Sequence, residues 1–250
     1  MSVLTILISL LFYASGLILI IGVANRIRIY WRTPSPLVIP TTPAPLTRTG
    51  VAARLFGEVV FFQSLFRGNK WTWILGWLFH FGMLLVLLRH LRYFTDPIWW
   101  WVDLIQWVGV YAGFAMVAGL AGLLVRRLVV ERIRYISAPS DHLMLLLLLG
   151  IGLSGLMMKH LVHTDIVSVK QFTMGLITFD WQPLPADPLL IIHLLMVATL
   201  MIIFPFSKLL HAPGVFFSPT RNMRDTPREQ RNLADWAAKL DETRHSGAGE

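Results

Sequence analysis

Four of the eight histidines lie within, or at the end of, two long apolar runs of the chain. His80 and His90 belong to the run 71–93, and His193 and His211 belong to the run 188–210. An ionisable side chain inside a membrane span is energetically costly, so its presence there indicates a function. For a single histidine the alternative is a hydrogen bond between helices, but two pairs favour ligand chemistry.

The spacing within each pair places the imidazoles at two levels. His80 and His90 lie about 15 Å apart along a helix, and the 18-residue step from His193 to His211 is about five turns, which returns both rings to one face. Because the two helices run in opposite directions, we expect His90 to meet His193 and His80 to meet His211. The second step spans about 27 Å in an ideal helix, so the pairing requires a kink at Pro205 or a His211 beyond the helical end.

Two neutral imidazoles from opposite helices suit a haem better than a bare metal ion. Zinc or copper takes three or four protein ligands close together, and no carboxylate or cysteine lies in the spans near these histidines. The absence of cysteine also excludes disulfides, iron–sulfur ligation by this chain and covalent haem attachment. The residues therefore predict two haem b groups, one held by His90 and His193 and one by His80 and His211.

The elements that must position these ligands are helices in lipid. The chain is 55% hydrophobic and only 14% charged, which is too little polar surface for a soluble globule of 250 residues. We predict an all-α integral membrane bundle of five transmembrane helices, because each span requires about 20 apolar residues. The first run lacks a basic segment and a cleavage site, so it is expected to remain as a helix. The five expected helices cover residues 3–24, 71–93, 101–125, 141–161 and 188–210.

The distribution of basic residues predicts the orientation. All but four of the 22 Lys and Arg residues fall on the side of the loops 26–70 and 126–134 and of the C-terminus; the exceptions are Arg89, Arg92, Lys159 and Lys170. By the positive-inside rule the N-terminus lies outside and the C-terminus in the cytoplasm, so we expect a multi-pass protein of the cytoplasmic (inner) membrane. The net charge of +8 is therefore a topology signal, and no nucleic acid is expected as a partner.

The segments between the spans are expected to differ in character. A Pro-rich link at 33–45 precedes an amphipathic helix at about 49–66, which would lie at the membrane surface or contact a partner. A loop of about 25 residues is expected before the fifth helix. We predict a membrane domain over 1–212, which includes the cytoplasmic loop 26–70, and a tail over 213–250. In the tail, Thr226-Pro227-Arg228-Glu229 resembles a capping box before an apolar stripe, so the tail is either solvated or carries a docking helix.

The ligand spacing resembles a known family. The segments F-H-F-G-M-L-L-V-L-L-R-H and I-H-L-L-M-V-A-T-L-M-I-I-F-P-F-S-K-L-L-H are similar to those of the dihaem cytochrome b gamma subunit of respiratory nitrate reductase, over roughly residues 1–212. The stretch H-A-P-G-V-F-F-S-P-T-R-N is similar to a branch of that family, the membrane cytochrome b of the Dsr complex associated with dissimilatory sulfite reductase.

This resemblance implies a quinone-reactive subunit of a membrane oxidoreductase in sulfur metabolism. Its substrate would be menaquinone or ubiquinone, and its partner a cytoplasmic iron–sulfur subunit related to heterodisulfide reductase. A periplasmic cytochrome c and other membrane subunits are further expected partners. In the quinol-oxidising direction, electrons would pass from the His90/His193 haem to the His80/His211 haem and on to that subunit.

The quinone site is where the chain departs from the family pattern. The nitrate reductase subunit has a Lys near the start of its third helix that contributes to the quinol site, whereas no Lys occurs here between Lys70 and Lys159. Other polar residues near the outer haem are candidates, although the arginines could equally anchor the topology. These candidates are Arg89, Arg92, Asp96, Asp103 and Gln106.

The remaining histidines and the chain as a whole each have alternative interpretations. His160 and His163 are either proton relays or exposed interfacial residues, His142 is expected at an interface and His245 in an inert tail. The competing function is a haem-free membrane anchor or a transporter with histidine proton relays, although the five unequal spans show no internal repeat. A third alternative keeps the haems and assigns a nitrate reductase or a heterodisulfide reductase as the partner.

Overall fold

The computed structural model describes residues 2–34 and 39–225, and these residues form helices and no β-strand. Five of the helices are long and apolar enough to cross a membrane. The prediction of an all-α, multi-pass membrane protein with five spans is therefore confirmed. These spans are Val3–Arg32, Lys70–Tyr93, Trp100–Val129, Pro139–Val162 and Pro188–Phe206.

The spans are built from five α-helices, three of which end in a tighter or wider turn. They are α1 (Val3–Arg32), α4 (Lys70–His90) with the 3₁₀ turn η1 (Leu91–Tyr93), α5 (Trp100–Val129), α7 (Pro139–Met157) with the π-helical η2 (Met158–Val162), and α9 (Pro188–Ile203) with the 3₁₀ turn η3 (Phe204–Phe206). The shorter elements are α2 (Arg48–Phe61), α3 (Gln63–Gly68), α6 (Glu131–Ile136), α8 (Ile166–Thr178), η4 (Lys208–Leu210), α10 (His211–Gly214) and η5 (Val215–Phe217).

The chain divides into two compact units. The bundle unit is Met1–Asn25 with Phe62–Leu210, and the second unit is Arg26–Phe61 with His211–Glu250. The predicted boundary at residue 212, the predicted tail 213–250 and the orientation remain predictions. The capping box at Thr226–Glu229 and His245 lie outside the described residues.

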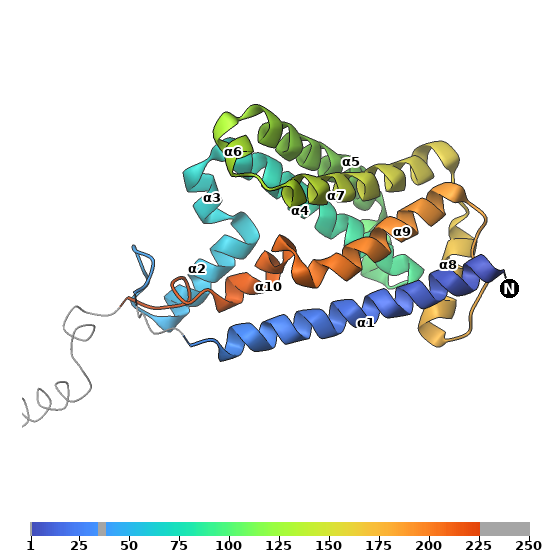
Figure 1. The fold of residues 1–250 in the computed structure, drawn as a ribbon, viewed down its shortest axis with the longest axis horizontal. Helices are drawn as coiled ribbons and strands as arrows, with labels where there is room; N and C mark the ends of the chain where they lie inside the picture. The colour runs from blue at the N-terminus through green and yellow to red at the C-terminus, as the bar shows by residue number, and fades with distance from the viewer. Residues whose placement is uncertain (1, 35–38, 226–250) are drawn as a thin grey trace, which may run out of the picture. The chain divides into compact units, whose positions relative to one another are not determined.

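Within the bundle unit, α4, α5, α7 and α9 pack as successive neighbours (Figure 1). Glycines allow α4 and α5 to approach closely. A Cβ atom at Gly82 would lie 2.8 Å from the backbone oxygen of Ala112, and one at Gly119 would lie 2.7 Å from the backbone nitrogen of Phe79. Because backbone atoms cannot move aside like a side chain, these two glycines set the distance between the helices.

The interior of the bundle lies where α4, α5 and α7 meet. Phe79, Met116, Leu120 and Leu148 form one buried apolar cluster there. Phe79 immediately precedes His80 in α4, so this cluster fixes the helix that carries two of the predicted ligands.

The connection between α7 and α9 differs from the predicted loop, because α8 occupies half of it. Asp165 caps α8 by accepting a hydrogen bond from the Val167 N–H. From α8, the Thr173 hydroxyl donates to the Tyr93 carbonyl at 2.6 Å, and Lys170 pairs with Asp96 at 2.9 Å. The helix thus fixes the segment in which α4 ends.

The fifth span is shorter than predicted, because α9 ends at Ile203 rather than at residue 210. Pro205 lacks an N–H group, and the chain continues as two 3₁₀ turns, η3 and η4. The assumption of one helix of five turns from His193 to His211 is therefore wrong. His211 follows the break and begins α10 in the second unit.

The predicted amphipathic helix is two helices. Phe62 adopts a left-handed conformation with a φ of 50° and separates α2 from α3. Within the second unit, Glu58 of α2 pairs with Arg221 at 3.2 Å, and Thr41 donates its N–H to the Thr220 carbonyl at 2.9 Å. The segment between the first and second spans and the segment after the fifth span are therefore joined within the second unit.

Candidate functional site

The two histidines of α4 share one hydrogen-bonding pattern. The Nδ1 atom of His80 lies 2.7 Å from the Gly76 carbonyl oxygen, and that of His90 lies 2.7 Å from the Val86 carbonyl oxygen. A carbonyl oxygen only accepts, so each Nδ1 carries the proton and each Nε2 holds the lone pair. Both imidazoles are partly buried. Each has the tautomer that a metal ligand bonding through Nε2 requires.

His193 of α9 is oriented by a different helix. Its Nδ1 atom lies 2.8 Å from the Ser154 hydroxyl of α7, and that hydroxyl donates to the Ile151 carbonyl at 3.0 Å. The single hydroxyl proton is therefore used, and the Ser154 oxygen accepts from the Nδ1–H of His193. His193 also lies close enough to His90 for an electrostatic interaction between the two rings. These two are the predicted ligands of one haem.

These residues fit a haem rather than a bare ion. Within residues 2–34 and 39–225, no group of three or more His, Cys, Asp or Glu side chains is placed to hold a metal. A b-type haem requires two imidazoles only, since the porphyrin supplies the remaining four ligands. His90 and His193 offer such a pair, with Nδ1–H groups held by protein oxygens.

His211 is exposed and lies in the second unit. Its pairing with His80 remains a prediction. In the bundle unit, the ring of His80 contacts Phe62 and Phe79, with ring centroids 5.1 and 4.5 Å away. These aromatic contacts restrict the rotation of the imidazole.

The remaining described histidines occupy helix ends. The Nδ1 of His142 lies 3.2 Å from the Ala138 carbonyl, in the first turn of α7. At the other end of this span, the exposed His160 contacts Phe114 from within η2, and the exposed His163 has a φ of 56°. Both alternatives for His160 and His163 remain open.

Three of the five candidate quinone residues converge next to His90. Gln106 of α5 accepts hydrogen bonds through its Oε1 from Arg89 at 3.2 Å and from Arg92 at 2.9 Å. Its amide group donates to the Val102 carbonyl at 3.0 Å, which fixes the orientation of the side chain. Gly109 makes room for the arginine, because a Cβ there would lie 2.7 Å from the Arg89 Cδ. We call Arg89, Arg92 and Gln106 the arginine cluster.

The other two candidates are placed differently. Asp96 pairs with Lys170 of α8, and Asp103 is exposed in the first turn of α5. Asp96 is thus bound to the connection between α7 and α9. The arginine cluster instead combines guanidinium donors from α4 and η1 with an acceptor from α5.

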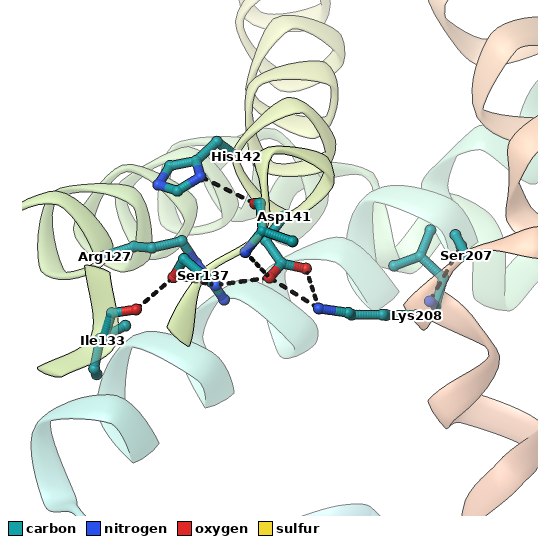
Figure 2. A network of polar contacts seen from close by, with 9 residues as sticks. Arg127, Ile133, Ser137, Asp141, His142, Ser207 and Lys208 are labelled. Carbon is teal, nitrogen blue, oxygen red and sulfur yellow. Dashed lines mark hydrogen bonds and ion pairs between the residues drawn. The ribbon is translucent and has the colours of Figure 1, made fainter. Parts of the chain in front are cut away.

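At the opposite end of α5, a second polar cluster joins three elements (Figure 2). The Asp141 carboxylate of α7 pairs with Lys208 of η4 at 2.6 Å and with Arg127 of α5 at 3.2 Å. It also accepts the Ala138 N–H at 3.1 Å, and Arg127 donates to Ser137 at 2.8 Å. The Asp141 side chain is only 10% exposed. It ties the chain after the Pro205 break to α5 and α7.

Comparison with known proteins supplies an independent observation. The family model of the nitrate reductase gamma subunit matches residues 64–231. A protein of Archaeoglobus fulgidus, named Hdr-like menaquinol oxidoreductase cytochrome b-like subunit, is 36% identical over 90% of this chain and 81% of its own length. A protein of the same name from Archaeoglobus profundus is 31% identical over 90% of this chain and 80% of its own length.

Proposed function

This chain belongs to the nitrate reductase gamma subunit family, and we propose that it is the dihaem cytochrome b subunit of a quinone-linked membrane oxidoreductase. The observation that carries the proposal is the pair His80 and His90 on α4. Both rings have their Nδ1 at 2.7 Å from a carbonyl of their own helix, so both have the tautomer of an Nε2 ligand. The relatives named as menaquinol oxidoreductase cytochrome b-like subunits support the link to quinone.

The protein's part in electron transfer is to hold and orient the haems. When bound, each haem accepts and donates single electrons at its iron. His90 and His193 would hold one haem, and His80 and His211 the other. The ten-residue step between His80 and His90 corresponds to about 15 Å along α4, which suits two haems at different depths of the bilayer.

Quinone is proposed to bind at the arginine cluster. A quinone carbonyl accepts hydrogen bonds, and the guanidinium groups of Arg89 and Arg92 are donors only. Gln106 accepts hydrogen bonds from both guanidinium groups, and Arg89 directly precedes the haem ligand His90 in α4. The substrate is menaquinone or ubiquinone, and Asp96 and Asp103 remain weaker candidates for contacts to it.

The electron partner is proposed to be a cytoplasmic iron–sulfur subunit related to heterodisulfide reductase. The chain has no cysteine, so an iron–sulfur cluster with cysteine ligands must belong to another chain. The printed name of both relatives contains the term Hdr-like, which supports this partner. The basic residues predict an N-terminus outside, which places this partner on the cytoplasmic side of the cytoplasmic membrane. The complex would serve sulfur metabolism. Its further partners would be other membrane subunits or a periplasmic cytochrome c.

Substitution of each ligand tests the assignment. His90→Ala and His193→Ala should each remove one haem and leave the same spectrum, whereas His80→Ala and His211→Ala should leave the other spectrum. His142→Ala is the matched control, because the Nδ1 of His142 also bonds to a carbonyl of its own chain four residues earlier. It should keep both haems. If His80→Ala and His193→Ala left the same spectrum, the proposed pairing would be wrong.

A further inference from the structure

The hydrogen bond between Ser154 and His193 distinguishes this ligand from the two on α4. His80 and His90 bond to carbonyls of their own helix, so their contacts move with that helix. The contact of His193 joins α9 to α7 at 2.8 Å. It is a side-chain contact, and a point substitution can therefore remove it without altering the ligand.

The surroundings of Ser154 leave its hydroxyl with one role. The residue is 5% exposed and sits in an apolar span, where a hydroxyl without partners costs free energy. Its proton goes to the Ile151 carbonyl at 3.0 Å, and its oxygen faces the His193 Nδ1. Both hydrogen-bonding functions of the hydroxyl are thus used between Ile151 and His193.

The adjacent position on α7 allows the ring to lie close. A Cβ atom at Gly155 would stand 3.6 Å from the Cε1 of His193, an ordinary contact distance. The imidazole therefore packs along α7, and the hydroxyl of Ser154 determines which way its Nδ1 points.

We infer that Ser154 is a positioning residue for the His193 ligand, and that its hydroxyl sets the orientation of the imidazole and the potential of the haem it holds. This inference rests on the proposed function. A hydrogen bond to Nδ1–H increases the basicity of the ring and so stabilises the oxidised iron. Loss of the bond should raise the midpoint potential of the His90/His193 haem. The haem of His80 and His211 should not respond, because Ser154 bonds to neither of its ligands in the described contacts.

The test is a potentiometric titration of both haems, with electron paramagnetic resonance of the oxidised protein, on the detergent-purified full chain. Ser154→Ala should move one midpoint to a higher potential and shift one low-spin signal. Ser154→Thr keeps a hydroxyl and should retain the wild-type midpoint potential and low-spin signal. Ser154→Cys has nearly the volume of serine but is a weak acceptor, so it should behave as the alanine variant does.

A matched control separates positioning from packing. Ser15 is also a buried serine in a span, and its hydroxyl donates to the Phe12 carbonyl at 3.1 Å. Ser15→Ala should leave both midpoints unchanged. The inference is overturned if Ser154→Ala and Ser154→Cys leave both haems unchanged, or if both haems shift together. A wild-type chain without haem would instead refute the proposed function itself.

Discussion

The distance between α4 and α5 determines where His80 lies, and Gly119→Ala tests this directly. The new Cβ would lie 2.7 Å from the Phe79 nitrogen and 2.8 Å from the Leu75 oxygen, both backbone atoms of α4. To reach the 3.4 Å of an ordinary contact, the helices must separate by about 0.7 Å. Because Phe79 precedes His80, this movement displaces the ligand.

The expected loss of stability follows from two opposing effects. Overpacking of a tight contact costs about 1–3 kcal/mol, and alanine regains up to about 1 kcal/mol through its helix propensity. Central values of about 2 kcal/mol for the cost and about 0.5 kcal/mol for the gain leave a net destabilisation of about 1–2 kcal/mol. For a chain of this size it lowers the melting temperature by roughly 2–8 °C.

Tryptophan fluorescence in detergent measures this change without relying on haem, since the chain has 10 tryptophans. Gly16→Ala is the matched control within a span, because its Cβ would meet only the Met201 Cε at 3.9 Å. It should melt at or above the wild-type temperature. If the melting temperature of Gly119→Ala were as high as that of Gly16→Ala, the contact at Gly119 would not set the distance between α4 and α5.

Three further predictions concern polar groups at the ends of the helices. Asp141→Asn should destabilise the detergent-solubilised chain by about 1–3 kcal/mol in thermal melts, because asparagine keeps one acceptor oxygen but lacks the negative charge that Arg127 and Lys208 share. Lys208→Ala should cost under about 1 kcal/mol, since the lysine is 76% exposed, and equal effects of the two substitutions would contradict the central role of Asp141. The hydrogen bond from Thr164 lowers the pKa of the Asp187 carboxyl, so the stability that this carboxylate contributes is present at neutral pH and is lost as the pH falls below about 4. Asp187→Asn should therefore be less stable than wild type at pH 7 and should show a flatter dependence of stability on acid pH. An unchanged acid profile would refute this role of Asp187. Gln106→Leu should slow the reduction of the haems by a menaquinol analogue while both haems remain bound, and unchanged kinetics would exclude the arginine cluster as the quinone site.

The five spans could be predicted because lipid imposes a single requirement, a long apolar helix, and each run meets it. The same criterion missed α8, whose 13 residues are too short to span a membrane. This helix fixes η1 through Thr173 and the turn after η1 through the pair of Lys170 with Asp96. It also extended the fifth helix beyond Ile203, since Leu209 and Leu210 continue the apolar pattern although Pro205 ends the regular hydrogen bonding.

The candidate site was predicted as far as spacing along one helix can reach. The spacing predicts that His80 and His90 lie at two levels of one helix. It contains no information on a hydrogen-bond partner that a different helix supplies to an Nδ1 atom. Spacing alone therefore does not connect Ser154 with His193. The sequence signal of Ser154 is a hydroxyl in the middle of an apolar span, and its separation of 39 positions from His193 hides the contact.

A haem count shows whether this chain holds two b-type haems. The chain, expressed with a sufficient haem supply and purified in detergent, would be measured by a dithionite-reduced minus oxidised spectrum and by pyridine haemochrome quantification. We predict about two b-type haems per chain, with His142→Ala giving the same value. A folded chain that carries no haem, although it was expressed with a sufficient haem supply, would refute the dihaem proposal and favour the haem-free anchor or transporter.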